Sequence, residues 1–132
     1  MLKKERFYFC LFNSIIGLSL GTLIYISFGE NTYINKVIPI SLSFRSLFTD
    51  ILLFYVADAL WAYALTFALS LFISETLSGI LTAIYGILWE ILQSFHPSLG
   101  TFDTADIIMY LSASTFAVLI INLYKKYKRR KK

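Results

Sequence analysis

Two carboxylates, Asp58 and Glu90, lie inside long apolar stretches of the sequence. A charge at the centre of a membrane helix costs about 2.5–3.5 kcal/mol, so each side chain must face a bundle interior, a water-filled cavity or a partner. If the two carboxylates meet, either one stays protonated or a cation lies between them, and Arg45 is the nearest candidate. The pair is therefore either a polar packing cluster that fixes helix register or part of an outward-facing binding or reactive pocket.

Other polar and aromatic residues extend this pair to a candidate binding cluster. Gln93 follows Glu90 by three residues and shares its helix face. Asp103 and Asp106 are also explained as the cap and first-turn charge of a helix. Trp61 is either a core-packing residue or part of a pocket wall. The full candidate set is Arg45, Asp58, Trp61, Glu90, Gln93, His96, Asp103 and Asp106.

The sequence does not indicate metal or cofactor chemistry. His96 has no second histidine and no nearby cysteine to complete a zinc site, and no Gly-rich phosphate loop or nucleophile motif occurs. We therefore assign no catalytic residue, no metal and no cofactor. Cys10 is the one cysteine, and we expect it to be a small core residue rather than an acylation site.

The elements that position these residues are predicted to be membrane helices. Hydrophobic residues make up 58% of the 132-residue chain, well above the roughly 45–50% of soluble domains. We expect one all-α membrane domain, residues 1–132, built as an integral membrane bundle of four transmembrane helices. The predicted spans are about 7–28, 50–73, 76–95 and 104–124, followed by a basic tail at 125–132.

The regions around the first span carry two further expectations. The span is longer than a signal-peptide core and lacks a small-residue cleavage site, so we expect it to remain attached. Within it, Gly17 and Gly21 form a small-residue pair that would let a neighbouring helix approach closely. Residues 29–49 are polar and contain Pro39, which predicts an interfacial loop rather than a continuous helix.

The distribution of basic residues predicts the orientation. Ten of the twelve Lys and Arg residues lie at the two ends of the chain. Loops rich in Lys and Arg remain cytoplasmic, so both termini should be cytoplasmic and the candidate cluster should lie on the outer side. The basic tail is expected to contact anionic membrane lipids rather than nucleic acid.

The stretch from Ile84 to Ala113 resembles the VanZ-like family of small multi-span bacterial membrane proteins. Glu90, Gln93, Pro97 and Asp106 stand at the positions of that family's signature, and the segment Asp58-Ala-Leu-Trp61-Ala-Tyr63 is similar to its second-span motif. The family has an arginine where this chain has Leu99 and an asparagine where it has Tyr110, so the implied charge pairing would need Arg45 as a substitute.

The resemblance implies a multi-pass protein of the bacterial cytoplasmic membrane with a role in the cell envelope, linked to resistance to teicoplanin-type glycopeptides. Our leading hypothesis is a non-enzymatic protein whose outward acidic pocket binds a lipid head group or a lipid-linked envelope precursor. The alternatives are a membrane enzyme that uses the paired carboxylates and a structural subunit of a homo-oligomer or membrane complex.

Overall fold

The computed structural model describes the backbone of residues 2–28, 50–96, 98 and 100–131. Four helices make up nearly all of this part of the chain: α1 (Leu2–Phe28), α3 (Asp50–Leu69), α4 (Glu75–Phe95) and α5 (Thr104–Arg130). The all-α prediction is confirmed. The predicted interfacial loop, including Arg45, lies outside the described residues.

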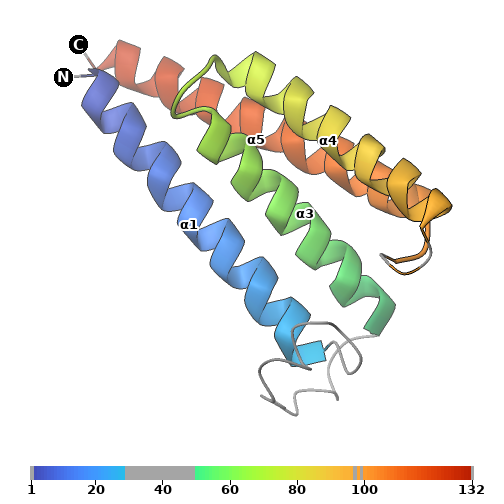
Figure 1. Cartoon of the computed structure of the whole chain (residues 1–132). Helices are drawn as coiled ribbons and strands as arrows, with labels where there is room; N and C mark the ends of the chain where they lie inside the picture. The colour runs from blue at the N-terminus through green and yellow to red at the C-terminus, as the bar shows by residue number, and fades with distance from the viewer. Residues whose placement is uncertain (1, 29–49, 97, 99, 132) are drawn as a thin grey trace.

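The helices pack side by side as a bundle, and the two chain ends lie together at one end of it (Figure 1). Helix α3 packs against α1, α4 and α5, and α4 packs along α5. We call the end that carries the termini the basic end and the opposite end, where α4 and α5 are joined, the acidic end. Placing both termini at one end agrees with an even number of crossings.

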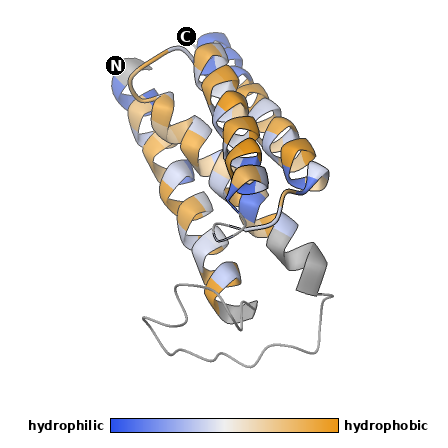
Figure 2. Ribbon diagram, turned by 45° about the vertical axis from the view of Figure 1, so that its right-hand side comes forward, coloured by the Kyte–Doolittle hydropathy of each residue, from blue (hydrophilic) through white to orange (hydrophobic). Residues whose placement is uncertain are grey.

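Three helical segments are long and apolar enough to cross a membrane: Lys4–Ile26, Glu75–Phe95 and Thr104–Arg130. The described part of α3 adds a shorter apolar segment, Tyr55–Leu69. Large hydrophobic side chains such as Phe12, Leu18 and Phe116 point away from the bundle. Hydrophobic residues dominate the helices, whereas hydrophilic residues gather near the chain ends (Figure 2). Apolar surface of this extent needs lipid around it, so the chain is a membrane protein.

Small residues set the distance between α1 and α3. A Cβ atom added at Gly17 would lie 3.2 Å from the backbone oxygen of Leu60, and one at Gly21 would lie 2.7 Å from the Trp61 ring. The expectation that this glycine pair admits a close neighbour is therefore confirmed.

Helix α4 presents a second small-residue face to the bundle, and Gly79 and Gly86 on this face lie against α5. Its buried positions recur every four residues, and they are Ser78, Thr82, Gly86 and Glu90, with Gly79 beside them. A Cβ atom at Gly86 would overlap the ring of Tyr110. The close approach of α4 and α5 therefore brings Glu90, the one carboxylate in this buried series, against α5.

A hydrophobic core cluster joins three helices near the basic end. It consists of Cys10 from α1, Phe67 from α3, and Ala117 and Ile121 from α5, all fully buried. Burial of Cys10 agrees with its expected role as a small core residue.

Helix α3 ends at Leu69, before the end of the predicted span at about Ile73. The chain leaves the helix at Leu69 and makes a turn in which the amide of Phe72 donates to the carbonyl of Leu69. The Arg6 guanidinium, through Nη2, donates to the carbonyls of Ser70 (2.8 Å) and Ile73 (3.3 Å), groups that a longer helix would not present together.

Helix α5 extends beyond the predicted span. It continues to Arg130, so most of the basic tail is helical. Positive side chains in the last turn interact favourably with the helix dipole, which explains the extension.

Candidate functional site

Glu90 binds the link between α4 and α5 from inside the bundle. This side chain is 1% exposed, and its Oε2 accepts a hydrogen bond from the backbone amide of Asp103 at 3.0 Å. A buried carboxylate is stabilised by each hydrogen bond that it accepts. This contact therefore explains part of why Glu90 is tolerated inside the bundle.

Gln93 fastens the same link one turn further along α4. With its carboxamide oriented to satisfy both groups, Nε2 donates to the carbonyl of Thr101 (3.0 Å) and Oε1 accepts from Nε1 of Trp89 (2.7 Å). Gly100 lies against this amide with a φ of 144°, a conformation that favours glycine. The Glu90–Gln93 face therefore positions the link and the Trp89 ring.

Asp103 caps α5 as predicted. Its Oδ1 accepts from the amide of Ala105 (2.8 Å), and its Oδ2 accepts from the hydroxyl of Tyr55 on α3 (2.7 Å). The Tyr55 hydrogen bond, with the Ala105 amide, lowers the pKa of Asp103 below its usual value. Asp103 thus ties α3, the link and α5 together and is largely committed to structure.

Three carboxylates from three helices, Asp58, Glu90 and Asp106, lie near enough for their negative charges to repel one another. Negative charge on Asp106 and on Glu90 makes ionisation of the Asp58 carboxyl less favourable. One oxygen of Asp106, Oδ1, is buried and has no hydrogen-bond partner among the described residues. No hydrogen bond among the described residues joins Asp58 to Glu90 or Gln93, so direct contact between the two carboxylates stays a prediction.

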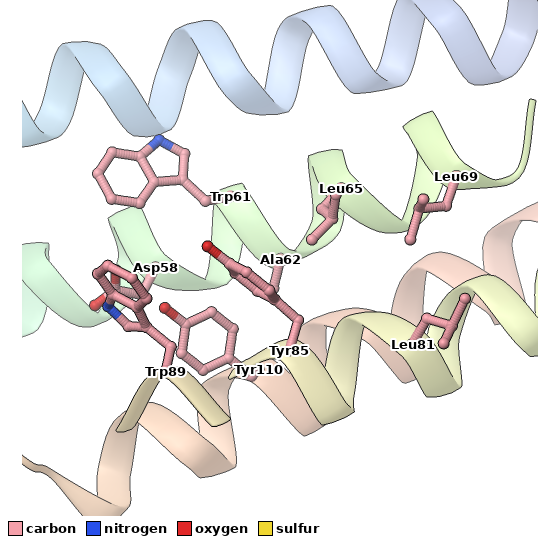
Figure 3. Close-up of a pocket in the computed structure, with 9 residues that line it drawn as sticks. All are labelled: Asp58, Trp61, Ala62, Leu65, Leu69, Leu81, Tyr85, Trp89 and Tyr110. Atoms are coloured by element: carbon pink, nitrogen blue, oxygen red, sulfur yellow. The ribbon is translucent and has the colours of Figure 1, made fainter. Parts of the chain in front are cut away.

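A cavity of about 630 Å³ opens beside Asp58, between α3 and α4 and against α5 (Figure 3). Its polar part is made by Asp58 and four aromatic side chains, Trp61, Tyr85, Trp89 and Tyr110. Its apolar part is made by Ala62, Leu65, Leu69 and Leu81. No hydrogen bond from a described residue reaches the Asp58 carboxylate, which is left to face this cavity.

Sequence reasoning found only part of this cavity. Asp58 and Trp61 were in the candidate set, but Tyr85 and Tyr110 were not, and Trp89 was not assigned to a pocket. Tyr85 and Trp89 are four residues apart, which places them on one face of α4 and is a signal that could have linked them. Tyr110 comes from another helix, so no local spacing could have indicated it.

Of the remaining candidates that the structure describes, none lines the cavity. His96 is exposed and follows the last residue of α4. Among the described residues, no group of three or more His, Cys, Asp or Glu side chains could hold a metal ion.

The basic end contains an ion cluster that the sequence did not predict. The carboxylate of Glu75, at the start of α4, contacts Nη2 of Arg6 (3.5 Å) and Nζ of Lys125. A further pair joins Lys128 to Glu5 at 2.9 Å. The Ser74–Glu75 segment, at which α4 begins, has no basic residue of its own. Its positively charged neighbours, Arg6 and Lys125, come from α1 and α5.

Comparison of the chain with models of protein families, with curated proteins and with solved structures found no match.

Proposed function

We propose that this membrane protein binds a lipid head group or a lipid-linked envelope precursor in the cavity beside Asp58. The main support is that the Asp58 carboxylate faces a cavity of about 630 Å³ and receives no hydrogen bond from a described residue. A cavity of this size, mainly apolar and with few polar groups, is typical of small-molecule sites. Its position between helices gives a lipid sideways access from the membrane.

Occupancy of the cavity can be tested by native mass spectrometry of protein purified in mild detergent. We expect the wild type to retain a lipid or lipid-linked adduct. Leu81→Trp fills the apolar part of the cavity and should remove the adduct, because Leu81 lines it. Leu88→Trp is the matched control, an exposed leucine on the same helix that does not line the cavity. Equal retention by the two variants would contradict the proposal.

We further propose that the chain is a VanZ-like protein of the bacterial cytoplasmic membrane. The support is the set of residues Glu90, Gln93, Pro97 and Asp106, with Asp58 upstream. Expression in a susceptible bacterium should raise the inhibitory concentration of teicoplanin, and Asp58→Asn should abolish the increase. An equal increase with Asp58→Asn would separate the phenotype from the cavity.

The proposed orientation places both termini in the cytoplasm and the acidic end outside. In a Cys10→Ala background, a cysteine introduced at Ser98 should react with a membrane-impermeant thiol reagent in intact cells. A tag after Lys132 should be inaccessible until the cells are opened. Reaction of the tag in intact cells would reverse the orientation.

A further inference from the structure

The cavity beside Asp58 presents one carboxylate within a group of aromatic rings. Figure 3 shows Asp58 from α3, Tyr85 and Trp89 from α4, and Tyr110 from α5 grouped around the cavity. Trp61 of α3 also lines the cavity, but its ring extends toward α1, where it lies against Gly21. The tyrosine hydroxyls point toward the Asp58 part of the cavity. Aromatic faces attract organic cations, and a desolvated contact contributes about 2 kcal/mol or more.

The surrounding charge favours a cation. The negative charges of Glu90 and Asp106 both repel a negative charge on Asp58. The described Lys and Arg side chains come from residues 4–6 and 125–131, at the basic end. Within the described part of the chain, no cationic side chain lies at the acidic end to neutralise these groups. A positive ligand would relieve the repulsion among the three carboxylates.

The shape and lining of the cavity select the kind of cation. The cavity offers Mg²⁺ or Ca²⁺ one carboxylate and two neutral tyrosine hydroxyls, fewer than the six or more oxygen ligands that these ions take, so a metal ion would be poorly coordinated by the protein. The leucine part of the cavity, Leu65, Leu69 and Leu81, continues from Asp58 toward the basic end (Figure 3). A ligand that fills both parts has a positive head and a hydrocarbon body.

We propose that this cavity binds a lipophilic organic ammonium ion, with its cationic head beside Asp58 among the aromatic rings and its hydrocarbon part along the leucines. The inference rests on the proposed function, because it names the chemical class that the same cavity accepts. Methylated ammonium groups suit this lining best, since aromatic faces stabilise a cation without donating or accepting hydrogen bonds.

Fluorescence of the native tryptophans provides a direct test. Trp61 and Trp89 are the only two tryptophans of the chain, and both line the cavity. The probe is benzyltrimethylammonium, and its comparison compound is neopentylbenzene, the neutral molecule of the same shape. After correction for partition into detergent micelles, we expect a saturable fluorescence change at about tenfold lower concentration for the ammonium compound.

Two variants assign the preference to the cavity. Asp58→Asn keeps the side-chain shape and should remove the tenfold preference for the ammonium compound. Tyr85→Leu replaces a half-exposed ring without changing charge and should weaken ammonium binding more than binding of the neutral compound. Glu5→Gln removes a carboxylate at the basic end and should leave the affinity for the ammonium compound unchanged.

The outcomes separate this inference from the proposed function. Equal affinity for the two compounds, or an unchanged preference in folded Asp58→Asn, would overturn the ammonium assignment. Retention of an anionic lipid in native mass spectrometry would overturn it as well, while leaving the cavity as a ligand site. Failure of Leu81→Trp to displace any adduct would reject the ligand site itself.

Discussion

At the basic end of the bundle Glu75 contacts two cations, Arg6 and Lys125, whereas near the acidic end Asp58 faces a cavity. Both carboxylates belong to helices that pack inside the same bundle. The paired carboxylate holds elements together, and its charge is already compensated. The carboxylate without a described cation or donor leaves its charge available, which is why we assign binding to that end.

The largest expected effect tests whether close packing builds the walls of the cavity. Gly86→Leu would drive a side chain into Tyr110, so we expect a loss of about 3 kcal/mol or more in folding free energy, measured as yield and Tm in detergent. Helix propensity alone favours leucine over glycine by up to about 1 kcal/mol. A stabilised Gly86→Leu variant would therefore contradict the close approach of α4 and α5.

The next effect tests the pairing at the basic end. Glu75→Ala leaves Arg6 and Lys125 without their shared carboxylate, and we expect a loss of about 1–3 kcal/mol in a thermal or denaturant titration. Glu5→Ala is the control, because the Glu5–Lys128 pair is about one third exposed on both sides and should contribute almost nothing. Similar losses for the two variants would show that exposure does not distinguish these pairs.

A smaller effect concerns Asp103, an acidic-end carboxylate with two described donors. Asp103→Asn should lower the Tm at neutral pH, because it weakens a cap and the Tyr55 hydrogen bond. The folded pKa of Asp103 is lowered, so its stabilisation is present above the unfolded pKa of about 3.9 and is lost as the pH falls through the folded pKa.

The Tm difference between wild type and Asp103→Asn should accordingly narrow below about pH 4. Tyr55→Phe removes the donor and should reproduce part of the loss at neutral pH. A difference that is constant from pH 7 to pH 3 would show that the charge of Asp103 is not involved.

The smallest effect on stability is expected at Asp58. Asp58→Asn removes a charge that no described cation compensates, so the Tm should stay the same or rise, while ligand retention is lost. Circular dichroism and native mass spectrometry on the same preparation measure the two quantities. A large drop in Tm would make Asp58 a structural residue like Glu75 and remove the difference between the two ends.

The helices and the cap at Asp103 could be predicted from the sequence, because apolar length and a capping residue are local properties. The end of α3 could not. Its apolar run continues to Ile73, and the turn depends on Arg6, which lies 67 positions away from Ile73. The same limit applies to Glu75, whose partners come from the first and last helices.

The candidate site shows the same division. Asp58 and Trp61 are close in sequence, and their unusual position in an apolar span drew attention to them. The sequence pointed to a contact between Glu90 and Asp58. The hydrogen-bond donor that the structure gives Glu90 is the backbone amide of Asp103, which only the folded link supplies. Tyr110 joins the cavity because Gly86 lets α5 approach, a relation between two helices that no single spacing contains.

The sharing of Glu75 between α1 and α5 has a consequence for biosynthesis. A ribosome delivers Arg6 first, Glu75 later and Lys125 last, so the ion cluster is completed only when the final helix has entered the membrane. The stacked rings of Phe9 and Tyr124, 3.9 Å apart, close the same junction between the first and last helices. A nascent chain without α5 therefore carries a carboxylate that lacks one of its two partners, together with an uncovered aromatic surface. We expect such chains to be substrates for membrane proteases, and assembly of this junction to mark the end of their exposure to quality control.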